Sequence, residues 1–277
     1  MKVSIIIAVY KDTEALELIF RSLEYQTYKN FEVVVAEDGE SIEMAKAVDI
    51  AQTKYDFSIV HTIQEDNGVR KSVSQNNAIR HSSGEYLIFI DGDCILYSNF
   101  IENHVILSAE KTVVSGRRVN LGPQYSNYLR EKVLDPLELE KSFMFKYFSI
   151  QKDASIERHT EEGFSIHING LIHTLMKKLR KKKFPLLGCN MSCYKAAMVD
   201  INGFDEALGN SAMAGDTDLE WRFEGLGYKI VSARFIANQF HLFHKRKASE
   251  YDRGQDLQML ENRKNKFFRC RIGLEKL

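Results

Sequence analysis

Apolar residues in the first third of the chain follow two alternating patterns. Residues 3–9 form a continuous β-branched run, which is typical of a strand buried on both faces of a parallel sheet. Asp12 and Thr13 can then cap a helix whose apolar residues recur at helical spacing up to Leu23. The alternation continues with strands predicted at residues 31–36, 58–62 and 86–90 and with helices predicted at residues 42–54 and 72–81. This order predicts an α/β fold with a mostly parallel central sheet flanked by helices.

The pattern becomes less regular after about residue 111. Strands are predicted near residues 113–114 and 229–231, and helices near residues 125–134 and 137–148. No internal repeat or low-complexity linker divides the chain. We therefore expect a single domain over residues 1–277, made of a regular half (1–112), a more irregular half (113–245) and a C-terminal tail (246–277).

A basic amphipathic helix is predicted at residues 167–184. Its apolar residues recur at helical spacing, and six of the seven residues from Lys177 to Lys183 are Lys or Arg, with no acid among them. One interpretation is a helix that packs its apolar side on the domain and leaves a solvated basic face. The other is peripheral contact with an anionic membrane. RNA binding is not favoured, because Phe184 is the one aromatic residue in the stretch.

The overall composition is that of a globular protein without a global charge. The 38 Lys and Arg residues balance 38 Asp and Glu, and 44% of residues are hydrophobic. This excludes disorder as the main state, and we expect no nucleic-acid partner. No apolar run reaches the ~18–20 residues that cross a bilayer, and the opening segment is too short for a signal peptide, so we expect a cytoplasmic protein. We expect the four cysteines to be reduced structural thiols: Cys94, Cys189, Cys193 and Cys270.

Acidic residues follow two of the predicted strands. Glu37 and Asp38 end the second strand, and Asp91-Gly92-Asp93 ends the fourth. Ligands of such sheets bind beyond the carboxyl ends of the strands. Residues i and i+2 of an extended segment project to the same side, and two carboxylates about 6 Å apart repel by roughly 3 kcal/mol, which a shared cation relieves. A solvated turn is the alternative, but the position after a buried strand favours a metal site.

Two groups of residues in the second half of the chain also carry candidate chemistry. Asp216 and Asp218 lie near the start of a predicted helix, where they can cap it or act as a general base. His241 and His244 are either structural or supply a third ligand to a divalent metal, and the spacing does not decide which of the two reaches it.

Arg70 and Lys71 follow a tight Asn-Gly turn. They are either solvated turn charges or ligands for a diphosphate. The chain contains no P-loop and no G-x-G-x-x-G motif, so ATP or NAD cradled by a helix is not supported.

The motifs together resemble glycosyltransferase family 2. They are SIIIAVY (4–10), EVVVAEDGES (32–41), the run from Asn67 to Ile79, GEYLIFIDGDC (84–94), NGFDE (202–206) and GDTDLEWR (215–222). The resemblance covers residues 2–244 and implies a Rossmann-like GT-A fold. It implies that residues 1–112 bind a nucleotide sugar, that residues 113–245 bind the acceptor, and that the anomeric centre is inverted.

The resemblance also implies roles for matching residues. Ala8 and Tyr10 would border the nucleobase, and Glu37 stands where many relatives have the aspartate that accepts from the uracil imide. Asp38 matches the second acid of that block. Arg70, Lys71 and Asn77 are expected at the nucleotide-sugar site.

Asp91, with Gly92 beside it, is expected near the ribose, the donor sugar and the metal, and Asp93 on the metal. Asp216 matches the catalytic base. Because Gly215 replaces the glutamate that usually precedes this base, Asp218 is a second candidate.

The resemblance therefore predicts an inverting glycosyltransferase that uses Mn²⁺ or Mg²⁺. The block from Asn202 to Arg222 is similar to the galactosyl- and N-acetylgalactosaminyltransferase branch, which favours a galactose- or N-acetylhexosamine-type sugar, with UDP as the expected nucleotide. The expected acceptor is a hydroxyl of a glycan or lipid-linked molecule in cell-surface polysaccharide synthesis, at the inner face of the membrane. The alternatives are a metal-dependent nucleotidyltransferase and a non-enzymatic, peripheral membrane-binding protein.

Overall fold

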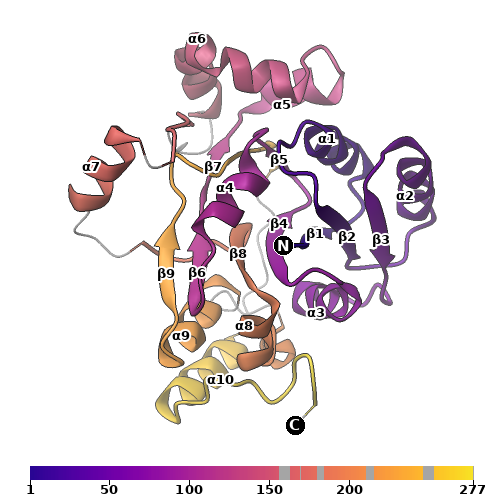
Figure 1. Ribbon diagram of the computed structural model, residues 1–277. Coiled ribbons are helices and arrows are strands. Elements are labelled where there is room, and N and C mark those ends of the chain that lie inside the picture. Colours follow the sequence, from indigo (N-terminus) through magenta and orange to yellow (C-terminus); the bar gives the residue numbers. More distant parts are fainter. Residues whose placement is uncertain (156–162, 169, 180–183, 210–214, 246–252, 277) are drawn as a thin grey trace.

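The central element of the fold is a seven-stranded sheet (Figure 1). The computed structural model describes residues 1–155, 163–168, 170–179, 184–209, 215–245 and 253–276. In spatial order the strands are β3 (Ser58–Thr62), β2 (Phe31–Glu37), β1 (Val3–Val9), β4 (Tyr86–Asp91), β8 (Asn190–Tyr194), β6 (Thr112–Ser115) and β9 (Lys229–Ser232). Strand β8 runs antiparallel to both neighbours, and the other pairings are parallel. The mostly parallel α/β sheet is confirmed.

Helices cover both faces of this sheet. They are α1 (Thr13–Glu24), α2 (Ile42–Lys54), α3 (Lys71–His81), α4 (Phe100–Leu107), α5 (Pro123–Arg130), α6 (Pro136–Ala154), α7 (Leu171–Leu179), α8 (Lys195–Asp200), α9 (Asp216–Gly225) and α10 (Arg253–Lys264), with a short 3₁₀ helix at Glu206–Leu208. Apolar residues of α1, α2 and α4 pack on one face, and those of α3, α8 and α9 pack on the other. Successive residues of β1 alternate between the two cores, which explains its continuous apolar run.

A smaller sheet extends the second half of the chain. It consists of β5 (Cys94–Leu96), β10 (Asn238–His241) and β7 (Arg117–Asn120), with β10 in the centre. Its inner face packs with α5 and α6 around a third apolar core, which includes Tyr97, Phe143 and Phe240. The short strands of both sheets in this half were not predicted, apart from those at β6 and β9, because three to five residues carry too little periodicity.

Local signals explain several element boundaries. Asp12 caps α1 by accepting from the backbone N–H of Ala15 at 3.0 Å, as predicted. The predicted basic helix is shorter than expected, since α7 covers Leu171–Leu179, and residues 180–183 lie outside the described residues. Among the described helices, none has the length and apolar character needed to span a bilayer. All four cysteines are buried and free of disulfides, as expected.

Candidate active site

The carboxyl ends of β1, β2 and β4 meet at one edge of the sheet. Ala8 pairs with Ala36 on one side and with Asp91 on the other, so the segments that follow these strands lie together. A Cβ atom on Gly92 would lie 2.9 Å from the carbonyl oxygen of Ala8, so glycine allows this close approach. A cavity of about 840 Å³ opens here, lined by Ala8, Val9, Tyr10, Asp12, Asp38, Gly68, Val69, Lys71, Ser74, Asp91, Gly92, Asp93, Arg130, Leu242, Phe243, His244 and Lys245.

The two acids after β2 have different environments. Glu37 is 1% exposed, accepts from the backbone N–H of Ser41 at 2.8 Å, and contacts Nε2 of His61 at 2.8 Å. Asp38 lines the cavity and accepts from Gln64 Nε2 at 2.6 Å and from the backbone N–H of Arg70 at 2.7 Å. Both carboxylates thus have partners on both oxygens, and the difference between them is that Asp38 lines the cavity whereas Glu37 does not.

Lys71 and Asp91 form an ion pair in the cavity wall. Burial disfavours the charged amine, but the Asp91 carboxylate outweighs this effect and raises the pKa of Lys71 above its ordinary value. Lys71 is the first residue of α3, so its amine and the N-terminus of that helix face the same cavity. The Arg70 guanidinium instead donates to the carbonyl oxygen of Glu65 and does not line the cavity.

Asp93 lies between two imidazoles. Its Oδ2 is 3.2 Å from His241 Nε2 and 3.4 Å from His244 Nε2. Burial alone would raise the pKa of Asp93, but the two histidines lower it to about 2. Pairing of β10 with β5 sets this geometry, because it places His241 opposite Cys94, the residue after Asp93.

These three side chains form a suitable donor set for a divalent cation. One ligand atom from each lies within 4.8 Å of the others. A carboxylate with two imidazoles suits Mn²⁺ and other first-row ions, and the observed ion contacts leave the carboxylate deprotonated, as a ligand must be. Both histidines reach the group, whereas Asp91 is engaged by Lys71 and is not part of it.

Asp216 begins α9 beside this cavity without lining it. Its carboxylate accepts from the backbone N–H of Gly188, and burial raises its pKa above the ordinary value. The charges of Lys71 and Asp91 both act on the Asp216 carboxylate. A Cβ atom at Gly188 would overlap Oδ1 of Asp216, so glycine is needed for this contact.

Asp218 has a different environment, although it lies two residues further along α9. It is 2% exposed, and its Oδ2 accepts from Nε of Arg222 at 2.7 Å. Arg222 is 1% exposed and also donates to the carbonyl oxygens of Ile201 at 2.9 Å and Gly203 at 2.7 Å. The Asp218–Arg222 pair therefore fastens α9 to the loop that precedes the 3₁₀ helix.

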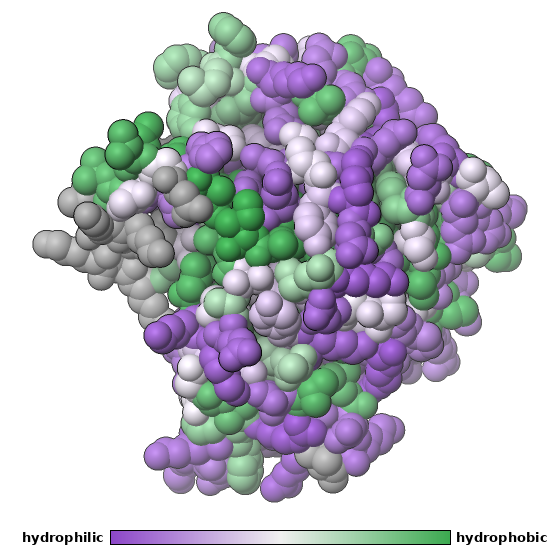
Figure 2. Space-filling model, viewed as in Figure 1, coloured by the Kyte–Doolittle hydropathy of each residue, from purple (hydrophilic) through white to green (hydrophobic). Residues whose placement is uncertain are grey.

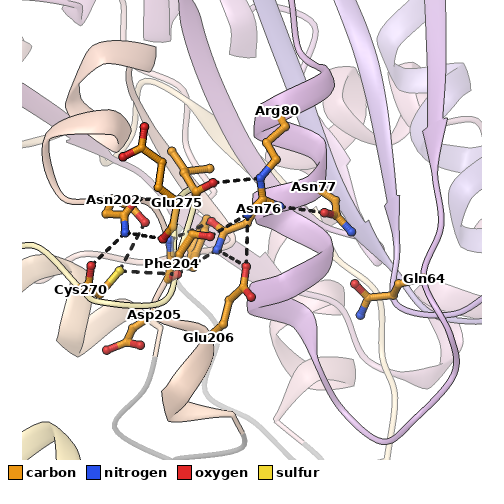
Figure 3. A network of polar contacts seen from close by, with 12 residues as sticks. Gln64, Asn76, Asn77, Arg80, Asn202, Phe204, Asp205, Glu206, Cys270 and Glu275 are labelled. Atoms are coloured by element: carbon orange, nitrogen blue, oxygen red, sulfur yellow. Dashed lines mark hydrogen bonds and ion pairs between the residues drawn. The ribbon is translucent and has the colours of Figure 1, made fainter. Parts of the chain in front are cut away.

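The network in Figure 3 joins α3 to the loop at residues 202–206 and to the C-terminal segment. Asn76 donates to the carbonyl oxygen of Phe204 and to Glu206, both at 2.9 Å, and accepts from the Phe204 N–H at 2.9 Å. Asn77 accepts from Nη1 of Arg80 at 2.8 Å and does not line the cavity. The structure places Asn77 outside the residues that a ligand in this cavity would contact.

The NGFDE segment also holds the C-terminal segment. Asn202 donates to the carbonyl oxygens of Cys270 and Glu275 at 2.9 Å each and accepts from the Glu275 N–H at 2.9 Å (Figure 3). Together with the Asn76 contacts, these bonds join α3, the NGFDE loop and the chain end. The segment thus has a packing role that accounts for its residue types.

Two arginines of the site were missed by the sequence analysis. Arg130 at the end of α5 lines the cavity and binds both oxygens of Asp12, at 2.9 and 2.6 Å. Arg118 on β7 donates to Sγ of Cys189 at 3.6 Å, and the charges of Asp91 and Asp93 act on it. Neither residue lies in a motif, and only long-range packing brings them to the site.

The fold and the cavity together define a class of protein. A mostly parallel sheet flanked by helices, with acids, a lysine and a candidate cation site at its carboxyl edge, is typical of α/β enzymes that bind nucleotides. The family model described as "Glycosyl transferase family 2" matches residues 4–188, more than half of the chain. The chain therefore belongs to glycosyltransferase family 2.

Curated relatives are similar over most of this chain. The glycosyltransferase GlyA of Streptococcus pneumoniae is 28% identical over 205 residues, which are 74% of this chain and 26% of the relative. The GalNAc(5)-diNAcBac-PP-undecaprenol beta-1,3-glucosyltransferase of Campylobacter jejuni is 24% identical over 185 residues, 66% of this chain and 54% of the relative. The chain thus spans about half or less of the length of these two relatives.

Solved structures share the fold. The mannosyltransferase PcManGT of Pyrobaculum calidifontis, in complex with GDP-Man and Mn²⁺, has a TM-score of 0.58 at 16% identity, over 94% of this chain and 61% of the neighbour. Staphylococcus aureus TarS residues 1–349, in complex with UDP-GlcNAc, has a TM-score of 0.57 at 15% identity, over 91% of this chain and 61% of the neighbour. These similarities establish a GT-A fold.

Proposed function

We propose that this chain is a metal-dependent, inverting glycosyltransferase that moves a sugar from a nucleoside-diphosphate donor to an acceptor hydroxyl. The observation that carries the proposal is the arrangement at the sheet edge. Asp93 and His244 line the same cavity as the Lys71–Asp91 pair, His241 completes the candidate cation ligands, and the charges of Lys71 and Asp91 act on Asp216. This arrangement supports a site that combines cation ligands, a positive charge and a carboxylate base.

The donor is proposed to be a UDP-linked galactose- or N-acetylhexosamine-type sugar. The family resemblance expects the uracil contact at Glu37, which does not line the cavity, so the neighbouring Asp38, which does, is proposed for this contact together with Tyr10. The complex of TarS with UDP-GlcNAc gives further support, whereas PcManGT binds GDP-Man. The packing role of the NGFDE segment reduces the weight of that segment as an indicator of the sugar.

Asp216 is proposed as the general base. Its raised pKa makes the carboxylate a better proton acceptor than an ordinary aspartate, and the Gly188 N–H fixes its orientation. The acceptor oxygen forms a bond to the anomeric carbon, its proton passes to Asp216, and the bond to the diphosphate oxygen breaks. Attack opposite the leaving group converts an α-linked donor into a β-linked product.

Cationic groups stabilise the departing diphosphate. Asp93, His241 and His244 are proposed to hold a divalent cation, Mn²⁺ or Mg²⁺, which would supply Lewis-acid neutralisation of the diphosphate charge. Lys71 places an ammonium at the same edge, and Asp91 holds it in position. The donor set, two imidazoles and one carboxylate, favours Mn²⁺ over Mg²⁺.

The acceptor is proposed to be a glycan or a lipid-linked sugar in polysaccharide synthesis. The Campylobacter relative carries a name that describes transfer to an undecaprenol-linked glycan, which supports this class of acceptor.

The proposal is tested by measuring nucleoside diphosphate release from UDP-Gal, UDP-GalNAc, UDP-GlcNAc, UDP-Glc and GDP-Man, each with and without Mn²⁺ and a lipid-linked acceptor. We expect UDP release that requires both metal and acceptor, loss of turnover in Asp216→Asn, and ordinary turnover in Glu43→Gln, a control on the exposed side of α2. Transfer with retention of the anomeric configuration, or full activity in the presence of a chelator, would overturn the mechanism.

A further inference from the structure

Three apolar residues of helix α7 are exposed to solvent. Leu171 is 91% exposed, Ile172 63% and Leu175 57%. These positions have the i, i+1, i+4 spacing that places side chains on one side of a helix. Figure 1 shows α7 at the edge of the molecule, outside the layers of the two sheets. The interpretation in which this helix packs its apolar side on the domain therefore does not hold for these three residues.

The segment before α7 is firmly attached to the folded body. The backbone N–H of Ile166 donates to the carbonyl oxygen of Phe235 at 2.7 Å, and Asn238 donates to the carbonyl oxygen of Phe164 at 3.0 Å. Ile168 is 8% exposed. Asn238 belongs to β10, the strand that also carries His241. The helix is thus tied to the strand that helps to form the catalytic edge.

A second apolar stripe lies on α6. Met144 is 67% exposed, Phe145 94% and Phe148 84%, again with i, i+1, i+4 spacing. Phe164, which precedes α7, packs against the ring of Tyr147 on α6 with a centroid distance of 4.8 Å. In Figure 2, hydrophobic residues lie over both α6 and α7, on the same side of the molecule.

The charge next to α7 is entirely positive. Six of the seven residues from Lys177 to Lys183 are basic, and no acid occurs between residues 163 and 186. Since the whole chain has a net charge of zero, this concentration is local. Such a cluster complements an anionic surface, and beside an exposed apolar stripe it is typical of a helix that lies in a membrane interface.

We propose that α7 docks on the surface of an anionic lipid bilayer, and that the exposed stripe of α6 makes a second apolar contact. Leu171, Ile172 and Leu175 enter the boundary between headgroups and acyl chains, and the basic composition of the sequence at 177–183 supplies the charge that an anionic surface attracts. A neutral partner or a second copy of this chain would use the apolar stripe but would not account for the six cations. The proposal concerns binding alone and does not depend on sugar transfer.

Flotation with lipid vesicles tests this proposal. The purified chain is mixed with vesicles of phosphatidylcholine alone or of phosphatidylcholine with phosphatidylglycerol, and the bound fraction is measured at low salt and near 1 M salt. We expect binding to the anionic vesicles that weakens strongly at high salt. In the variant with glutamine at Lys177, Lys178 and Lys181–Lys183, about fivefold for each of the five charges removed gives an expected loss of about 3,000-fold.

Matched apolar variants distinguish specific binding through α7 from non-specific hydrophobic binding to vesicles. Leu171→Ser/Ile172→Ser/Leu175→Ser is expected to weaken binding by more than about tenfold. The control, Leu257→Ser/Leu260→Ser, removes apolar residues of similar exposure, 66% and 49%, from α10 and is expected to bind normally. Thermal melting of each variant reports whether it is folded, and the α7 variant is expected to melt like the wild type because its side chains are already exposed.

Three results would overturn the proposal. They are equal binding by the α7 variant and the wild type, equal binding to neutral and anionic vesicles, and no binding to either. Sedimentation that detects a dimer abolished by the α7 substitutions would assign the surface to a second copy of the chain. Because UDP release is measured in vesicle-free solution, the outcome for membrane docking is separate from the outcome for transfer.

Discussion

Replacing Asp218 with asparagine tests the division of roles between the two acids of α9. Asp218 and Arg222 are both nearly inaccessible to solvent, at 2% and 1% exposure, and they bond at 2.7 Å. Loss of the carboxylate charge leaves the Arg222 guanidinium buried, with the carbonyl oxygens of Ile201 and Gly203 as its remaining partners. Breaking a buried pair in this way costs about 3–5 kcal/mol.

That cost is a large share of the usual stability of a protein, about 5–15 kcal/mol. For a chain of this size, each kcal/mol shifts the melting temperature by about 2–4 °C. We therefore expect Asp218→Asn to melt about 6–20 °C below the wild type. The fraction that remains folded should keep a substantial part of the turnover, because the side chain does not line the cavity.

The matched variant Asp216→Asn should behave in the opposite way. Burial raises the pKa of Asp216 above its unfolded value, so the folded state disfavours the charged form, and removing the charge does not destabilise the fold. We expect an unchanged or slightly higher melting temperature and a loss of about 10²–10⁴ in kcat, the usual contribution of a positioned base.

Thermal melting and UDP release are measured on both variants and on the wild type. Melting of Asp218→Asn at the wild-type temperature, together with lost turnover, would transfer the base role to Asp218 and refute this reasoning. Full turnover by Asp216→Asn would remove the base assignment as well.

Three further perturbations test the site and the fold. Gly188→Ala should displace the Asp216 carboxylate and lower kcat by about 10²-fold with little change in donor KM. The control is Gly39→Ala, which should turn over normally because the added Cβ would lie 3.7 Å from its nearest neighbouring atom, an ordinary van der Waals distance. His241→Ala should weaken Mn²⁺ binding, measured by calorimetry without substrate, by about 10–100-fold, and an unchanged affinity would remove this residue from the metal site. Burial alone would raise the pKa of Glu32, but hydrogen bonds from two serines outweigh it and lower this pKa to about 2. The ionised carboxylate therefore stabilises the fold fully above the unfolded pKa of 4.5, and this stabilisation is lost as the pH falls through 2. Urea unfolding between pH 5 and pH 2 should therefore show a steeper loss of stability in the wild type than in Glu32→Gln, and parallel curves would contradict this explanation.

In the first half of the chain, the continuous apolar runs and the helical spacing of apolar residues were sufficient to predict the strands and helices. Strands such as β1 and β4 are buried on both faces, so each residue must be apolar, and this pattern is visible without any partner. The Asp91-Gly92-Asp93 triplet could be placed at the catalytic edge because it directly follows such a strand. Short strands such as β5, β7 and β10 gave no comparable signal, and their pairing depends on contacts between distant segments.

Side-chain partners were decided by the tertiary structure. Glu37 and Asp38 are adjacent in sequence, yet β3 supplies His61 to the first, and the loop that begins α3 supplies an N–H to the second. Asp216 and Asp218 differ in the same way, because Arg222 lies one turn away from Asp218 on the same helix. Residue type thus identified these four acids as candidates but did not distinguish those that line the cavity from structural ones.

The sequence by itself determined the order of strands and helices over residues 3–91, the family and the presence of acids and histidines of the right kind. The tertiary structure decided that His241 and His244 both reach Asp93, that Arg118 and Arg130 approach the site, and that the apolar side of α7 stays uncovered. The physical reason is the separation along the chain between the residues that interact. Periodicity and capping act over a few residues and are visible locally, whereas burial, ion pairing and cation binding depend on which distant segments the packing brings together.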